Sequence, residues 1–210
     1  MMASITRCCI NRWFEWTGRA GAVTMFVLLS SLAYAQNATE FTQYQVERFD
    51  DEIVLSAQVA FELPAAVEEA LLKGVPLYFV NEAEVLRERW YWYDKKISAA
   101  ERHLRLAYQP LTRRWRLNVT AGAGRDASLG LALNQSFDTL AQVLSAIKRV
   151  SRWKIADAGD LDTNQKYKVE FRFRLDLNQL PRPFQIGALG QSDWDIAASS
   201  SSVLVVSTLK

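Results

Sequence analysis

Tyr167-Lys-Val-Glu-Phe-Arg-Phe-Arg-Leu-Asp176 is the stretch that decides the fold class. Apolar side chains occupy every second position from Tyr167 to Leu175, and charged side chains occupy the positions between them. Successive side chains of a strand point to opposite faces, so this alternation predicts a β-strand with one face in the core. Strands with one solvated face are typical of antiparallel sheets.

The same period recurs along the chain and predicts further strands. Residues 53–61 alternate in this way, and the acidic turn Asp50-Asp51 can join them to a partner strand at 41–49. Further strands are expected at 77–93, 102–109 and 114–120, with a turn at 110–113 between the last two. In the first of these, Trp90 and Trp92 would share the core face.

Two segments have helical features instead. Pro64 suits a first helical turn, residues 65–73 favour helix, and Gly74 suits the stop. Apolar residues at helical spacing predict a second, amphipathic helix over 138–150, capped by Ser136. The sequence therefore predicts a mainly β fold, an antiparallel β-sandwich-like single domain with two helices. An α+β packing is the alternative.

The N-terminal segment has the pattern of an export signal. Arginines precede an apolar run from Ala20 to Leu32, which is shorter than the roughly 20 residues that cross a bilayer as a helix. Ala33 and Ala35 then supply the small residues that a signal peptidase requires before Gln36. We therefore expect cleavage after Ala35 and a mature chain without a transmembrane span.

This interpretation divides the chain into three parts. Residues 1–35 are the predicted signal peptide, and residues 36–198 are the predicted β-rich domain. Residues 199–210 are expected to be an edge strand or a disordered C-terminal tail. The mature protein is expected in the periplasm or otherwise outside the cytosol.

Composition excludes several classes of function. Residues 1–35 hold three of the 25 basic and one of the 23 acidic residues, so the remainder is formally neutral and has no global field for nucleic acid. Both cysteines, Cys8 and Cys9, lie in the predicted signal, which leaves no thiol for a disulfide, a zinc site or a nucleophile. No motif for a cofactor is present, and we expect none to bind.

Catalytic patterns are equally scarce. His103 is the only histidine, and its place within a predicted strand favours a sheet-surface residue. Ser145-Ala-Ile-Lys148 and Ser151-Arg-Trp-Lys154 match the serine-x-x-lysine pattern of penicillin-recognising enzymes without that family's companion motifs. Residues 160–164 imitate the start of a calcium loop but lack its glycine and its glutamate, which favours a polar turn.

Four stretches together resemble a known family. They are Gly74-Val-Pro-Leu-Tyr-Phe79, Arg89-Trp-Tyr-Trp-Tyr-Asp94, Leu106-Ala-Tyr-Gln-Pro-Leu-Thr-Arg-Arg-Trp115 and Arg174-Leu-Asp-Leu-Asn-Gln-Leu-Pro-Arg-Pro-Phe-Gln185. In this order they resemble an exported proteobacterial family with a domain of unknown function, sometimes labelled proline-rich signal-peptide protein. The resemblance implies the periplasm or envelope of a Gram-negative bacterium and implies no activity. Within the last stretch, Leu180-Pro-Arg-Pro-Phe184 is expected to be extended, as in a polyproline II segment.

One feature points to a binding surface. If the hairpin and the long strand share a sheet, six basic side chains would share its solvent face, namely Arg105, Arg114, Arg116, Lys168, Arg172 and Arg174. Such a face suits an anionic partner, either an envelope protein or anionic lipid head groups. We therefore expect a non-catalytic exported protein that binds a partner or ligand through a sheet face. The alternative is a periplasmic enzyme with a carboxylate- or hydroxyl-based site that the linear sequence hides.

Overall fold

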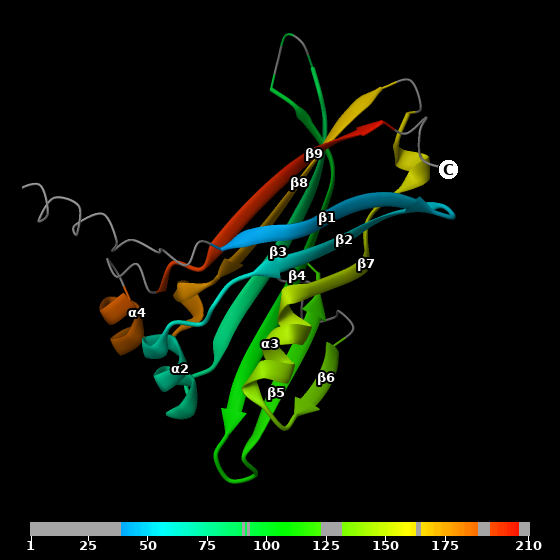
Figure 1. Cartoon of the computed structure of the whole chain (residues 1–210). Coiled ribbons are helices and arrows are strands. Elements are labelled where there is room, and N and C mark those ends of the chain that lie inside the picture. Colours follow the sequence, from blue (N-terminus) through cyan, green and yellow to red (C-terminus); the bar gives the residue numbers. More distant parts are fainter. Residues whose placement is uncertain are drawn as a thin grey trace, which may run out of the picture. The chain divides into compact units, whose positions relative to one another are not determined.

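A computed structural model describes residues 39–89, 91, 93–122, 132–162, 165–188 and 194–205. The chain from Ala38 onward forms one compact unit (Figure 1). The predicted signal peptide and its cleavage site lie outside the described residues.

Two antiparallel sheets make up most of this unit. The six-stranded sheet has the order β6 (Ala132–Phe137), β5 (Arg114–Ala121), β4 (Lys95–Gln109), β3 (Leu77–Arg87), β8 (Lys166–Leu175) and β9 (Ala197–Val205). The three-stranded sheet has the order β1 (Glu40–Phe49), β2 (Glu52–Ala60) and β7 (Arg149–Asp157). The helices in the described part are α2 (Ala65–Leu72), α3 (Leu140–Lys148) and α4 (Arg182–Ala188), with short 3-10 helices η2 (Ala158–Asp160) and η3 (Leu177–Gln179). The prediction of a mainly β, antiparallel single domain is confirmed.

Strand β8 alternates as its sequence predicts. Tyr167 is 1% exposed, and Val169, Phe171 and Phe173 are fully buried. Burying a large apolar side chain of this kind stabilises the fold by roughly 1.5–3 kcal/mol. Strand β8 is therefore an internal strand of the larger sheet, with β3 on one side and β9 on the other.

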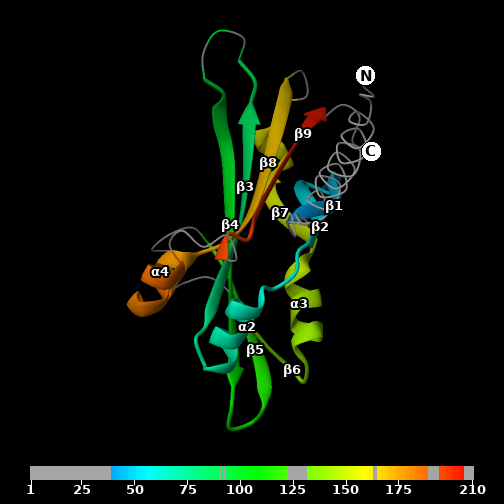
Figure 2. The same cartoon turned by 60° about the vertical axis from the view of Figure 1, so that its left-hand side comes forward.

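The inner face of the six-stranded sheet has two different covers (Figures 1 and 2). The three-stranded sheet covers one half, where Leu55 of β2 and Trp153 of β7 join the core around Phe171. Helices α2 and α3 cover the other half, where Leu71 and Ile147 join the core around Phe79 and Phe173. One half is thus a β-sandwich, and the other packs helices on a sheet as α+β domains do.

A polar side chain lies on strand β3 where the two covers meet. Asn81 is fully buried between Phe79, which belongs to the helix-covered core, and Ala83, which belongs to the sandwich core. Neither its amide nitrogen nor its amide oxygen has a hydrogen-bond partner among the described residues. Buried polar groups are nearly always paired, so this residue is an exception within the core.

The ends of the two predicted helices have clear physical causes. Gly74, which follows α2, has φ +86°. The amides of Gly74 and Val75 close the helix, because Gly74 N–H donates to Leu71 O and Val75 N–H donates to Ala70 O. This is the Schellman arrangement, which glycine favours because it has no Cβ. Helix α3 begins later than predicted, because Thr139 rather than Ser136 caps it by accepting a hydrogen bond from Gln142 N–H.

Three other predictions need correction. Strand β3 ends at Arg87, not Tyr93, and Trp90 and Trp92 lie outside the described residues. The predicted helix 138–150 ends at Lys148, and β7 follows at once. The segment expected to be extended after Leu180 contains helix α4 instead. Its prolines precede or fall within the first helical turn, where no backbone N–H is needed.

The C-terminal serines form an edge strand. Residues 197–205 are β9, which pairs with β8 in antiparallel register. Residues 206–210 lie outside the described part of the chain.

Candidate functional site: the outer face of the six-stranded sheet

The outer face of the six-stranded sheet carries the predicted basic residues. The register pairs Tyr78 with Arg105 and Glu82 with Arg172, which puts these side chains opposite the core face of β3. The same alternation puts all six predicted cations on this face: Arg105, Arg114, Arg116, Lys168, Arg172 and Arg174. Whether the face binds an anionic partner stays a prediction.

Carboxylates neutralise the basic residues of strand β8. Glu170 lies between Lys168 and Arg172, with N···O distances of 2.7 and 3.0 Å. The hydrogen bond from Lys168 is the main reason why the pKa of Glu170 is lowered and that of Lys168 is raised. This end of the face is therefore a network of ion pairs rather than a basic patch.

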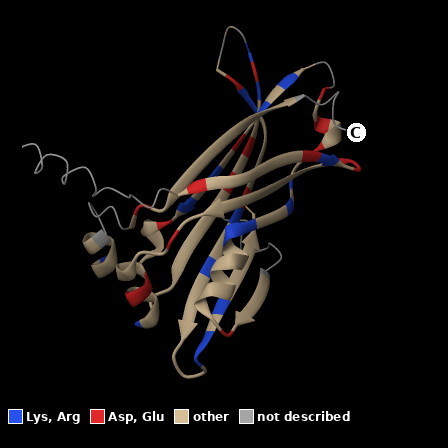
Figure 3. Ribbon diagram, in the orientation of Figure 1, with Lys and Arg blue, Asp and Glu red and all other residues tan. Residues whose placement is uncertain are grey.

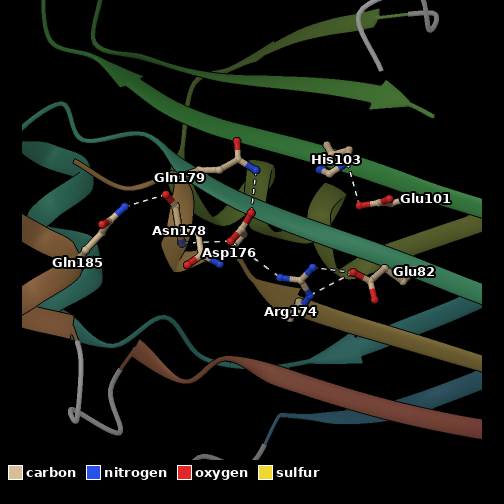
Figure 4. Close-up of polar contacts among 8 residues, drawn as sticks. All are labelled: Glu82, Glu101, His103, Arg174, Asp176, Asn178, Gln179 and Gln185. Carbon is tan, nitrogen blue, oxygen red and sulfur yellow. Dashed lines mark hydrogen bonds and ion pairs between the residues drawn. The ribbon is translucent and has the colours of Figure 1, made fainter. Parts of the chain in front are cut away.

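Arg174 belongs to a second network, which Figure 4 shows in close-up. Its guanidinium donates to Glu82 at 2.6 Å and lies 3.9 Å from Asp176. The hydrogen bond to Glu82 is the main cause of the raised pKa of Arg174. Asp176 also accepts hydrogen bonds from Asn178 N–H and from the Gln179 side chain. The network thus joins the end of β8 to η3, which favours a structural role.

Arg105 and Arg116 differ from the other four. Arg105 donates to the Tyr78 hydroxyl at 3.2 Å, and its guanidinium lies 5.9 Å from the centre of that ring. Within the described part of the chain, neither Arg105 nor Arg116 forms an ion pair, whereas Arg114 lies 3.3 Å from Asp138. Arg116 lies opposite Ala107 on β4 and Arg105 lies opposite Asn118 on β5, so these two arginines, which have no carboxylate partner among the described residues, are diagonal neighbours.

The outer face therefore has two parts that differ in net charge, a neutralised part on β8 and a basic part on β4 and β5. Figure 3 shows basic positions along β4 and β5, where few acidic residues accompany them. Cross-strand diagonal neighbours are roughly 7–8 Å apart, so Arg105 and Arg116 can contact one anionic group together. The part of the predicted surface whose positive charges are not all neutralised is thus the part on β4 and β5.

The residues considered for catalysis have ordinary partners. His103 Nε2 lies 3.0 Å from Glu101 on the same solvent face. Ser145 Oγ donates to Ala141 O, and Lys148 lies over the Phe61 ring, so this serine–lysine pair is not joined by a hydrogen bond. Across the described residues, no group of three His, Cys, Asp or Glu side chains could hold a metal ion.

Sequence reasoning missed a feature of the three-stranded sheet. A groove of about 270 Å³ crosses its outer face, lined by residues of β1, β2 and β7 that include Ser56, Arg149 and Arg152. The helix predicted at 138–150 overlaps the first two residues of β7, and no strand is predicted for the rest of β7. A second groove of about 210 Å³ lies between β8 and β9, beside Arg172 and Ser200. The run of serines at 199–202 does not by itself predict this groove.

Comparison with known proteins places the chain in a family. No curated protein and no solved structure gave a match. No helix in the described ranges is long and apolar enough to cross a membrane. The sequence model of one family, a domain of unknown function (DUF4390), matches residues 36–203. Because this match covers most of the chain, the protein belongs to the DUF4390 family.

Proposed function

We propose that this protein is exported, loses residues 1–35, and binds an anionic envelope partner without catalysing a reaction. The observation that carries the proposal is the pair of exposed arginines on β4 and β5, Arg105 and Arg116, which have no carboxylate partner among the described residues. Arg172 and Arg174, which lie on the same face but on β8, already have carboxylate partners.

The packing of the domain leaves part of the outer face of the six-stranded sheet open. The helices α2 and α3 and the three-stranded sheet all pack on the inner face (Figure 2), which leaves Arg105, Arg114 and Arg116 exposed on the other. Guanidinium groups pair with carboxylates through two parallel hydrogen bonds. An acidic protein surface in the envelope therefore fits this face.

The shifted pKa values of the described carboxyl groups reflect ion pairing. A general acid needs a carboxyl group whose pKa is raised towards neutrality. The shifted carboxyl groups of the described residues are Glu69 and Glu170, and both have lowered pKa values, chiefly because a lysine donates a hydrogen bond to them. These two groups are therefore suited to ion pairing.

The family match supports the expected start of the mature protein. It begins at Gln36, the residue predicted to follow the signal peptide. Mass spectrometry of the protein from its native host should find an N-terminus at Gln36 or within a few residues of it. Recovery of the intact N-terminus from the cytosol would refute the export part of the proposal.

The binding part is tested by two double variants that change the net charge equally. Arg105→Gln/Arg116→Gln removes the free cations, and Arg172→Gln/Arg174→Gln removes cations that are already paired. Capture of partners from envelope extract on the immobilised protein should fall at least about tenfold for the first variant, since charge-assisted hydrogen bonds contribute about 1.5–3 kcal/mol each. An equal loss in both variants would show that only net charge matters, and unchanged capture would refute the site.

A further inference from the structure

The groove on the outer face of the three-stranded sheet is a second, independent candidate site. It has a volume of about 270 Å³ and is lined by Gln43, Gln45, Ser56, Ala57, Gln58, Arg149, Val150, Ser151 and Arg152. Its floor is the sheet itself, and three strands contribute polar side chains to it. It lies on a different sheet from Arg105 and Arg116, so it does not rest on the function proposed above.

A β-bulge in strand β7 shapes this groove. Leu55 pairs with Trp153 and Ala57 pairs with Val150, so both Ser151 and Arg152 stand opposite Ser56. Arg152 has φ +39°, a left-handed conformation that is uncommon for any residue but glycine. Its backbone N–H donates to Ser56 Oγ at 3.1 Å, which holds the bulge against β2. Bulges commonly redirect side chains, and this one exposes two neighbouring polar residues.

The two arginines of the groove are not neutralised by the protein. Arg149 Nε donates to Ser151 Oγ at 3.2 Å, and the Arg152 guanidinium lies 5.4 Å from the centre of the Phe49 ring. Neither forms an ion pair with a carboxylate in the described part of the chain.

Three of the four acidic residues in the strands of this sheet have other partners, and the fourth, Glu40, is the first residue of β1 and pairs with Ala60. Glu52 and Asp157 both bind Lys154, at 2.9 and 2.7 Å. Glu47 accepts a hydrogen bond from the Gln45 side chain. The lining of the groove therefore includes two arginines without a carboxylate partner among the described residues, together with several neutral hydrogen-bonding groups.

We propose that this groove binds a phosphate monoester through Arg149 and Arg152. A phosphate monoester carries a charge of about −1.5 to −2 and three acceptor oxygens, so its charge balances that of two guanidinium groups. A single carboxylate carries one negative charge and would balance only one of them. Serine hydroxyls and glutamine amides in the groove supply further donors to the remaining oxygens. The ligand is either a soluble phosphorylated molecule or the head group of a phosphomonoester lipid.

The variants follow from the geometry of the bulge. Arg152→Gly removes the side chain but keeps a residue that adopts the left-handed conformation without strain. Arg149→Gln removes the other charge. Arg113→Gly is the matched control, because Arg113 also has positive φ (+52°) but lies in the turn between β4 and β5. Each substitution removes one positive charge.

The test uses two probes at constant ionic strength. Inorganic phosphate is titrated while the amide NMR signals of Ser151 and Arg152 are followed, and flotation measures binding to vesicles of phosphatidylcholine with phosphatidic acid. We expect saturable binding to one of these probes, weakened at least about tenfold by Arg149→Gln and by Arg152→Gly but not by Arg113→Gly. Binding to phosphate indicates a soluble ligand, and binding to vesicles alone indicates the lipid head group.

Several results would overturn the proposal. They are no saturable binding to either probe, equal weakening by the Arg113 control, or normal binding by both groove variants. The thermal midpoint of Arg152→Gly is measured in parallel, because relief of the strained φ and the greater freedom of glycine in the unfolded chain act in opposite directions. Loss of binding with an unchanged midpoint is assigned to the missing guanidinium group, and Arg149→Gln repeats the test without a change at the bulge.

Discussion

Replacing Asn81 by leucine should stabilise this protein, although the change removes a polar side chain from a strand. Asn81 is fully buried, and both polar atoms of its amide lack a partner among the described residues. Leucine has the same number of side-chain heavy atoms as asparagine. The substitution therefore removes the cost of desolvating the amide, although the two methyl groups of leucine occupy more space than the amide group they replace.

The expected gain in the free energy of unfolding follows from the burial of the unpaired amide. A buried polar group without a hydrogen bond costs about 1–3 kcal/mol. We expect Asn81→Leu to raise the free energy of unfolding by that amount, and to raise the thermal midpoint by about 2–4 °C for each kcal/mol in a domain of this size.

Urea unfolding at pH 7, followed by circular dichroism, measures the change, with an unaltered m-value as the sign of an unaltered unfolding transition. Asn118→Leu is the matched control. Asn118 lies on strand β5, where its amide donates to Asn134 at 2.8 Å and accepts from Thr120 at 3.1 Å near the solvent. Because the control removes these hydrogen bonds, it should lower the free energy of unfolding by about 0.5–1.5 kcal/mol, a change of opposite sign to that expected for Asn81→Leu.

A second substitution separates two reasons for failure. If Asn81→Leu destabilises the protein and the smaller Asn81→Val stabilises it, leucine is too large for the site. If both destabilise it by 1 kcal/mol or more, the amide forms a hydrogen bond in the folded protein. That result would refute the reasoning.

Three further predictions concern single contacts. The pKa of Glu170 is lowered mainly by the hydrogen bond from Lys168. The ionised Glu170 carboxylate therefore stabilises the fold above the unfolded pKa of about 4.3, and this stabilisation is lost as pH falls through the lower folded pKa. The difference in the free energy of unfolding between the protein and Glu170→Gln, measured in urea, should shrink from pH 6 to pH 3. Thr139→Ala should cost about 1 kcal/mol by removing the cap of α3, whereas Ser136→Ala should leave unfolding nearly unchanged. Gly74→Ala should cost about 1–2 kcal/mol, measured by thermal unfolding, because φ is +86° even though an added Cβ meets no atom within 4 Å.

The sequence alone determined the elements whose pattern is local. The alternation in β2, β3 and β8 reflects a buried and a solvated face of each strand, which neighbouring residues reveal directly. The end of α2 was also predictable, because Gly74 marks a backbone conformation that other residues disfavour. Residues such as Arg172 and Arg174 could be assigned to the solvent face for the same reason.

Other elements depend on tertiary context. Strand β7 was missed because the bulge at Ser151 and Arg152 breaks the alternation, and the pairing with β2 is what stabilises that bulge. Helix α4 was missed because Pro181 and Pro183 suggested an extended segment. In the folded chain Pro181 O accepts from Phe184 N–H, and the Gln185 side chain donates to Leu180 O.

The charge state of the candidate surface was decided by the tertiary structure. The sequence indicates that Arg105, Arg116 and Arg174 can share a face, but strand order determines which carboxylates lie beside each of them. Glu82 is 92 residues from Arg174 and becomes its partner only because β3 pairs with β8. Arg105 and Arg116 stay free because β4 and β5 bring Asn118 and Ala107 opposite them. Side-chain periodicity is a local property, whereas the neutralisation of a charge depends on neighbours that only the folded chain brings together.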